Sequence, residues 1–160
     1  MRADLFDGLD IPPELIVEFF LVFSRFEFAL KDIGYCRQNR HGIAGPNWEG
    51  FRDESTQWFR EPAAGSAESH AIDELLAEPP RVQTGPKAWE PRPLRAGSRI
   101  AQALEGAQRV RNNLFHGGKH TPHSPKGRDE ILVRSALTVL DCCLASHQAL
   151  RESFEQPYRY

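Results

Sequence analysis

Cysteine is scarce in this chain of 160 residues, which contains only Cys36, Cys142 and Cys143. An odd count with two adjacent positions argues against a disulfide framework and favours a reducing compartment. No C-x-x-C pair occurs, so the usual spacing of a structural metal site is missing. We therefore expect a protein that works without a metal, and no pattern in the sequence points to a cofactor.

A long hydrophobic run is also missing. The most apolar stretch, residues 15–23, contains Glu18 and is followed at once by Arg25 and Glu27, so it is too short and too charged to span a bilayer. The N-terminal residues include Asp4 and Asp7 rather than the basic start of a secretory signal. These absences predict a cytoplasmic protein with no membrane partner.

The overall composition is that of an ordinary globular protein, with 40% hydrophobic and 26% charged residues. A chain of this length can build one substantial core but not two. We therefore expect a single domain that spans residues 1–160.

Helical periodicity accounts for most of the chain. Apolar residues recur at helical spacing in five segments, which are residues 12–35, 48–59, 69–77, 98–117 and 129–154. No β-strand alternation is apparent, and the Pro-rich residues 79–97 predict a long loop that Trp89 could pin. The fold prediction is all-α: a single bundle of four to five helices, with this loop before the helix that Ser98 caps.

The first predicted helix carries more apolar surface than one buried stripe requires. Phe20, Leu21 and Phe28 widen its apolar face beyond the positions that a bundle core would bury. A helix this apolar either lies at the centre of a bundle or has a second face that a partner subunit covers. We therefore expect a homodimer whose interface involves residues 19–28 or the edge that bears residues 109–116.

Charge is distributed unevenly along the chain, although the formal net charge is only −2. Residues 1–80 contain 7 Lys and Arg against 15 Asp and Glu, whereas residues 81–128 contain 10 against 2. Such asymmetry can mark a nucleic-acid-binding surface in an otherwise acidic protein. The alternative is that the basic stretch neutralises the acidic one within the fold or across a dimer.

Residues 109–120, RVRNNLFHGGKH, combine arginine and histidine in the centre of this basic region. The guanidinium group is always charged, and its forked donors suit phosphate. Histidine can take and give a proton near neutral pH. His116 could remove the proton of an RNA 2′-hydroxyl while Arg111 stabilises the charge that builds on the phosphorane oxygens, with no need for a metal.

Arg111 and His116 match the R-x(4–6)-H signature of the HEPN superfamily, in which a polar residue, often Asn, follows the arginine as Asn112 does here. The segment also resembles that family in lying in a late helix just before the final one, and residues 23–31 resemble helix one of such proteins. The superfamily includes ribonuclease toxins, anticodon nucleases and nuclease domains of RNA-guided effectors. The resemblance implies a helical bundle that often dimerises so that two such segments face one cleft.

The resemblance implies that Arg111 and His116 are catalytic and that Asn112 orients them. On an ideal helix positions 111 and 116 lie about 140° apart, whereas Arg109, Asn112 and His116 lie closer to one face. Arg109 also satisfies the spacing to His116, so the identity of the arginine stays open. We favour Arg111 because Asn112 follows it.

Other side chains would support this site. Glu27 could hold an active-site arginine or pair with Lys31 one turn later. We expect the tryptophans, Trp48, Trp58 and Trp89, to be core anchors rather than stacking platforms for bases. The basic residues that we expect to contact RNA are Lys119, His120, Lys126 and Arg128.

Each catalytic candidate has a structural alternative. His116 could meet the last carbonyls of its helix, and Arg111 could pair with a carboxylate of the first helix at the edge of the core. The leading expectation is a homodimeric endoribonuclease of toxin–antitoxin or anti-phage defence, with an antitoxin or a larger complex as a possible partner. The second is a non-catalytic HEPN module that binds RNA, nucleotide or protein, and the third is a helical subunit of a larger complex.

Overall fold

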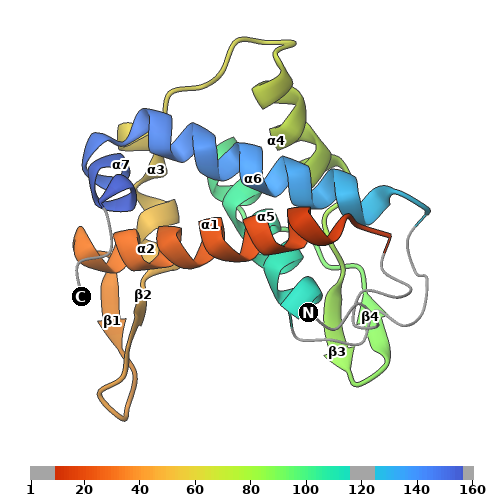
Figure 1. Ribbon diagram of the computed structural model, residues 1–160, viewed down its shortest axis with the longest axis horizontal. Helices are drawn as coiled ribbons and strands as arrows, with labels where there is room; N and C mark the ends of the chain where they lie inside the picture. The colour runs from red at the N-terminus through yellow and green to blue at the C-terminus, as the bar shows by residue number, and fades with distance from the viewer. Residues whose placement is uncertain (1–9, 116–124, 157–160) are drawn as a thin grey trace.

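The computed structural model describes residues 10–115 and 125–156. These residues form seven helices and two antiparallel hairpins, and the fold is mainly helical (Figure 1). The helices are α1 Pro13–Asp32, α2 Trp48–Asp53, α3 Ser55–Trp58, α4 Ala67–Ala77, α5 Arg99–Phe115, α6 Arg128–Ser146 and α7 Gln148–Glu155. The strands are β1 Cys36–Gln38 paired with β2 Ala44–Pro46, and β3 Val82–Gly85 paired with β4 Ala88–Glu90.

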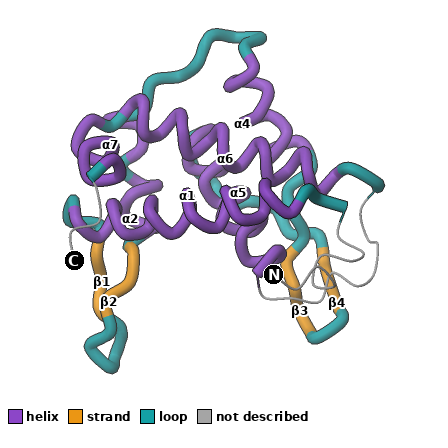
Figure 2. Tube along the Cα trace, in the orientation of Figure 1, coloured by secondary structure: helices purple, strands orange, loops and turns teal. Residues whose placement is uncertain are grey.

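The three long helices α1, α5 and α6 form the centre of the bundle (Figure 2). α4 packs against α5 and α6, while the short α7 packs back against α1 and α6. Both hairpins extend from the same side of α1 in the view of Figure 1. The prediction of a mainly helical bundle is thus confirmed.

α1 supplies the largest part of the aromatic core. Phe19, Phe23, Phe26 and Leu30 recur at helical spacing, and none is more than 2% exposed. The ring of Phe51 on α2 meets Phe26 edge to face, with centroids 5.9 Å apart. This packing fixes the aromatic face of α1, and Arg111 of α5 lies over the Phe23 ring on that helix.

Two of the three tryptophans join this aromatic cluster. Trp48 is buried and stacks on Phe26 with centroids 5.5 Å apart, and Trp58 stacks on Phe51 at 4.5 Å. Trp89 is half-buried on β4, and its buried indole Nε1 has no hydrogen-bond partner among the described residues. Trp48 and Trp58 are therefore packing residues, as predicted.

A glycine allows α4 to approach α5 closely. A Cβ atom at the buried Gly106 would lie 3.1 Å from the Cβ of Leu75, which is closer than side chains normally pack. The side chain of Ser66 caps α4 by accepting a hydrogen bond from the Ser69 amide at 3.1 Å. Leu75 of α4 therefore packs directly against the backbone of α5.

The all-α prediction was wrong in detail, because two hairpins are present. The four strands are three or four residues long, and every residue in them is exposed or half-buried. None of the strands therefore has a buried face that alternation could reveal. β3 and β4 lie within residues 79–97, where we expected a loop without regular structure. The Asn39-x-x-Gly42 turn and the Thr84-to-Lys87 turn were the available local signals.

Several predicted helix boundaries also differ from the structure. α1 ends at Asp32, and Gly34 follows with a φ of 103°, a left-handed conformation that glycine adopts without strain. The predicted helix of residues 48–59 is divided at Glu54, and the predicted helix of residues 129–154 is broken at His147. The Nδ1 atom of His147 accepts from the Leu150 amide at 3.3 Å and so caps α7.

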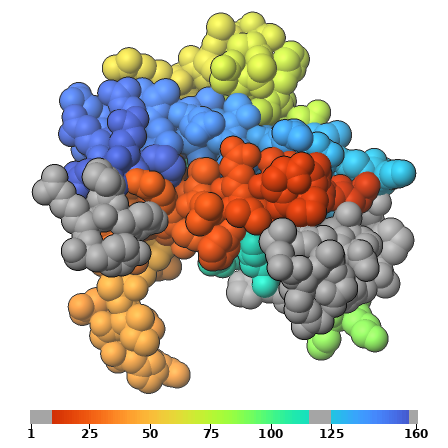
Figure 3. Space-filling model, in the orientation of Figure 1, coloured from red at the N-terminus to blue at the C-terminus, as the bar shows by residue number. Residues whose placement is uncertain are grey.

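A stripe of exposed apolar side chains follows α1, which occupies the front of the molecule in Figure 3. Its members share one helical face at spacings of three, four and seven residues and are 46–55% exposed: Val17, Phe20, Leu21 and Phe28. We call this set the α1 stripe. No helix in the described residues is long and apolar enough to cross a membrane.

Candidate functional site

The last turn of α5 faces α1 through Arg111 and Phe115, which are four residues apart and so lie on one face of the helix. The Arg111 guanidinium carbon is 5.7 Å from the centre of the Phe23 ring, a cation–π contact. The ring of Phe115 stacks on Phe19 at 6.2 Å and meets Phe20 edge to face at 5.4 Å. Arg111 is therefore half-buried against an aromatic surface beside the α1 stripe.

Asn112 is exposed and contacts Arg111 directly. Its Oδ1 atom accepts a hydrogen bond from Nη1 of Arg111 at 3.2 Å. One donor of the guanidinium fork is used in this way, and the group carries five in all. The contact agrees with the orienting role that we expected for Asn112.

No carboxylate pairs with Arg111 among residues 10–115 and 125–156. The structural alternative in which Arg111 forms an ion pair with the first helix therefore finds no support there. A guanidinium that rests on a ring face and keeps donors unused is suited to bind an external anion.

His116, Lys119 and His120 lie outside the described residues, so their predicted roles remain predictions. His116 follows Phe115 directly in the sequence, and Phe115 is the last residue of α5.

Arg109 has a different environment from Arg111. Its guanidinium group donates to the backbone carbonyls of Arg92 at 2.6 Å and Pro93 at 2.8 Å, and to the Glu105 carboxylate at 2.8 Å. Its side chain is only 12% exposed. Arg109 thus holds the residues that follow β4 against α5. Because its donors are used in this way, we favour Arg111 as the arginine available for chemistry.

Other α5 residues help to hold the same segment. Asn113 donates to the Arg81 carbonyl at 2.8 Å, and Gln102 donates to the Arg95 carbonyl at 3.1 Å. The Glu105 carboxylate also lies 3.5 Å from Arg52, whose pKa is lowered by burial. The sequence indicated that Trp89 could pin this loop, and polar side chains of α5 also hold it in place.

Glu27 forms neither of the two expected pairs. Its Oε1 atom accepts a hydrogen bond from the Trp48 indole at 3.0 Å. Trp48 in turn packs on Phe23 with centroids 5.4 Å apart, and Phe23 underlies Arg111. Glu27 therefore fixes the aromatic surface on which Arg111 rests. The sequence showed Phe23 only as a core residue.

The two remaining basic candidates differ in their surroundings. Arg128 is 15% exposed and donates to the Glu74 carboxylate at 2.8 Å and to the Glu78 carbonyl at 2.8 Å, so it ties the start of α6 to the end of α4. These bonds use donors on both terminal nitrogens of the guanidinium, and the expected role of Arg128 in RNA binding remains a prediction. Lys126 is exposed, and its side chain forms no hydrogen bond or ion pair in the described part of the chain.

A small cavity lies behind α5, away from the Arg111 face. Val110, Leu114, Leu132 and Val133 are among its mainly apolar lining residues, and its volume is no larger than a water molecule needs. It is too small for a nucleotide. Within residues 10–115 and 125–156, no group of three or more His, Cys, Asp or Glu side chains is arranged to hold a metal ion.

Comparison of the chain with protein-family models, with curated proteins and with solved structures gives no match. We therefore infer a function from the residues of α5, from their contacts and from the mainly helical fold.

Proposed function

We propose that the chain is a metal-independent endoribonuclease of the HEPN type, in which Arg111 and His116 act on one scissile phosphate. The observation that carries the proposal is the state of Arg111, which rests on Phe23 and meets Asn112 but pairs with no carboxylate in the described residues. Arg109 and Arg128, by contrast, are engaged by carbonyls and carboxylates. Arg111 is thus the arginine of the motif that can bind phosphate.

The proposed reaction is an attack within the RNA strand. His116 removes the proton of a 2′-hydroxyl, and the 2′-oxygen bonds to the adjacent phosphorus. The bond from phosphorus to the 5′-oxygen breaks, and the departing 5′-oxygen takes a proton from water. Arg111 stabilises the negative charge that develops on the non-bridging oxygens. The products carry a 2′,3′-cyclic phosphate and a 5′-hydroxyl end.

We also propose that two copies of the chain form a homodimer through the α1 stripe. Phe20 belongs to this stripe and also contacts Phe115, the residue before His116. An interface over the stripe therefore brings the motifs of two copies toward one another, and it removes about half-exposed aromatic side chains from water. The resemblance to HEPN toxins extends the proposal to a role in toxin–antitoxin or anti-phage defence, with an antitoxin as a possible partner.

The test is cleavage of single-stranded RNA by the purified chain in EDTA, with analysis of the product ends. We expect cyclic phosphate ends, and a loss of about 10²–10⁴-fold in rate for His116→Ala. The loss for Arg111→Ala should be of about 10²–10³-fold, and Arg111→Lys should recover only part of it because lysine lacks the planar fork. Arg134→Ala is the control, because Arg134 is an exposed α6 residue that pairs with Glu130.

Three results would each contradict a part of this proposal. Cleavage that requires a divalent metal contradicts the mechanism, and full activity of Arg111→Ala contradicts the site. Binding of RNA without cleavage by the wild-type protein favours the non-catalytic HEPN module.

A further inference from the structure

The β1–β2 hairpin is a firmly built projection from the helical bundle. At its tip Oδ1 of Asn39 accepts from the backbone amides of His41 at 2.9 Å and Ile43 at 3.0 Å. The Gly42 amide donates to the Asn39 carbonyl at 2.9 Å, and Gly42 has a φ of 76°, which suits glycine. These bonds hold the turn in one conformation.

The base of the hairpin is anchored to the aromatic core. The Asn47 amide donates to the Tyr35 carbonyl at 2.8 Å, and the ring of Tyr35 meets Phe51 edge to face at 5.1 Å. The Tyr35 hydroxyl donates to the Glu54 carboxylate at 2.7 Å. Specific bonds therefore hold both the turn at the tip and the base of the hairpin, although the strands between them extend away from the helical bundle.

The hairpin adds nothing to the hydrophobic core. All three β1 residues are exposed, as is the whole turn, and Ile43 is 65% exposed. An isolated two-stranded hairpin is only marginally stable in water. Among the described elements, the hairpin has its main contacts with α1. A hairpin built with this many local bonds and with an exposed tip is suited to contact another molecule.

Its charge indicates what that molecule is. Residues 36–46 include Arg37 and Arg40 and contain no Asp or Glu, in a half of the chain that is otherwise acidic. Arg37 lies 3.5 Å from Glu49, but both side chains are more than half exposed, so the pair is weak. Arg40 donates only to the neighbouring His41 imidazole, at 3.0 Å, within the described residues. These groups fit an anionic partner.

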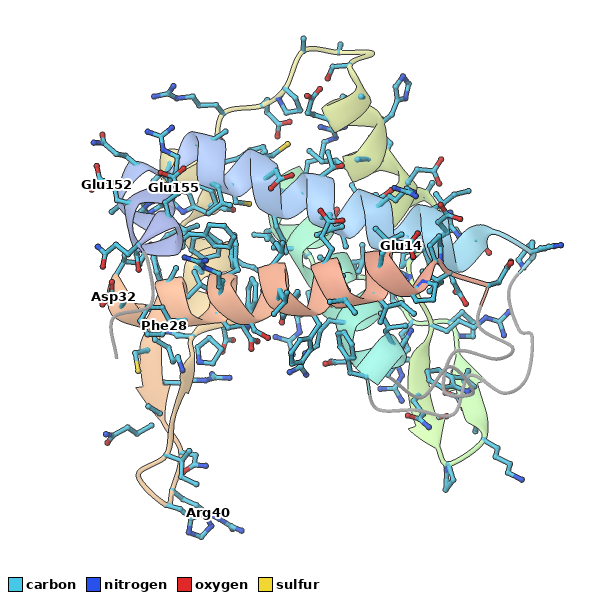
Figure 4. The ribbon with its side chains drawn as sticks, viewed as in Figure 1. Glu14, Phe28, Asp32, Arg40, Glu152 and Glu155 are labelled. Carbon is cyan, nitrogen blue, oxygen red and sulfur yellow. The ribbon has the colours of Figure 1, made fainter. Side chains whose placement is uncertain are left out.

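The hairpin and the proposed catalytic arginine lie on one side of the molecule. Trp48 lies two residues after β2, and its ring packs on Phe23, which carries the Arg111 guanidinium on its face. Figure 4 shows Phe28 where α1 meets the hairpin and Arg40 at the tip, while Glu152 and Glu155 lie beyond the opposite side of α1. At about 3.4 Å per residue, the five residues from base to tip extend roughly 17 Å.

We propose that the β1–β2 hairpin is a second RNA-binding element, which contacts backbone phosphates through Arg37 and Arg40 several nucleotides from the scissile bond. The inference rests on the proposed function for the identity of the anion. Arginine side chains commonly contact phosphate oxygens, and contacts of that kind are independent of sequence. It holds the strand while Arg111 engages the phosphate that reacts.

The experiment measures RNA binding by the full chain in the His116→Ala background, in EDTA, with a labelled single-stranded oligonucleotide at several salt concentrations. The test variant is Arg37→Gln with Arg40→Gln. The matched control is Arg134→Gln with Arg151→Gln, which removes the same charge from exposed positions on α6 and α7. Circular dichroism confirms that each variant keeps its helices.

We expect the hairpin variant to bind RNA on the order of tenfold more weakly at low salt and to lower the salt slope by about 1.4, which is two contacts at about 0.7 each. The control should change the slope by less than half of that. Equal effects of the two variants, or an unchanged slope in the hairpin variant, would overturn the proposal. So would a change in molecular mass with unchanged RNA affinity, because the hairpin would then contact a second copy.

The outcome is separable from that of the proposed function. Cleavage is measured on the chain with His116 intact. If that chain does not cleave RNA but binding still depends on Arg37 and Arg40, the enzyme proposal fails and the RNA-binding hairpin stands. If cleavage occurs and binding ignores these arginines, the reverse holds.

Discussion

Arg109 and Arg111 fit the same sequence signature, but their contacts predict opposite consequences when each is replaced by alanine. Arg109 is nearly buried and donates three hydrogen bonds of 2.8 Å or less. Two go to the backbone carbonyls of Arg92 and Pro93, which follow β4, and one goes to the Glu105 carboxylate. Arg111 makes one 3.2 Å hydrogen bond to an exposed neighbour and one cation–π contact. Stability and activity should therefore separate between the two positions.

The magnitudes follow from these contacts. A hydrogen bond to a charged group contributes about 1.5–3 kcal/mol. The carbonyls that Arg109 leaves can regain water when the loop relaxes, so we expect Arg109→Ala to cost about 3 kcal/mol rather than the sum. A partly exposed cation–π contact contributes about 0.5–1 kcal/mol. Arg111→Ala should therefore cost less than about 1 kcal/mol.

Thermal and urea unfolding measure this difference. For a chain of this size 1 kcal/mol corresponds to about 2–4 °C in Tm, so Arg109→Ala should lower Tm by roughly 6–12 °C and Arg111→Ala by less than about 4 °C. Arg109→Lys should fall between wild type and Arg109→Ala, because lysine keeps the charge but cannot reach all three acceptors.

Activity is then compared at a temperature at which both variants are folded. Arg111→Ala should lose most of the cleavage rate, and Arg109→Ala should keep it. Equal loss of stability at the two positions, or a greater loss for Arg111→Ala, would show that the contacts have been misread. If folded Arg109→Ala is the inactive protein, Arg109 is the catalytic arginine.

Three further predictions concern the surface. Phe20→Asp should convert a dimer into a monomer by light scattering with little loss of helix, because it places a charge in the α1 stripe; a wild-type monomer at micromolar concentrations would contradict the interface. Lys126→Gln should lower the salt slope of RNA binding by about 0.7, whereas Arg128→Gln should mainly lower Tm because Arg128 ties α6 to α4; the opposite pattern would reverse the two roles. Burial, followed by the hydrogen bond to Glu54, raises the pKa of Tyr35 to about 12. The folded state therefore favours the protonated phenol, and its contribution to stability is complete below pH 10 and is lost as the pH rises toward 12. Tyr35→Phe should lose less stability than wild type across that range, and parallel pH curves would contradict this.

The helices of this protein could be predicted from the sequence because helical periodicity is a local property. The spacing of Phe19, Phe23 and Phe26 identified the buried face of α1, and the surplus at Phe20, Leu21 and Phe28 identified the exposed one. Ser98 was correctly read as a cap of α5, since its hydroxyl accepts from the Ala101 amide at 3.2 Å. The two hairpins were missed because their short strands carry no buried face.

The sequence by itself also predicted that Arg109 and Arg111 lie in the helix before the last long one. It could not determine which arginine is available, because Arg109 and Arg111 both satisfy the motif. Only the tertiary structure decided this point. Arg109 is engaged by Arg92, which is 17 residues away in the chain, and Arg128 is engaged by Glu74, which is 54 residues away. A guanidinium is available for phosphate only if no carbonyl or carboxylate already uses its donors, and those acceptors come from parts of the chain that folding alone brings together.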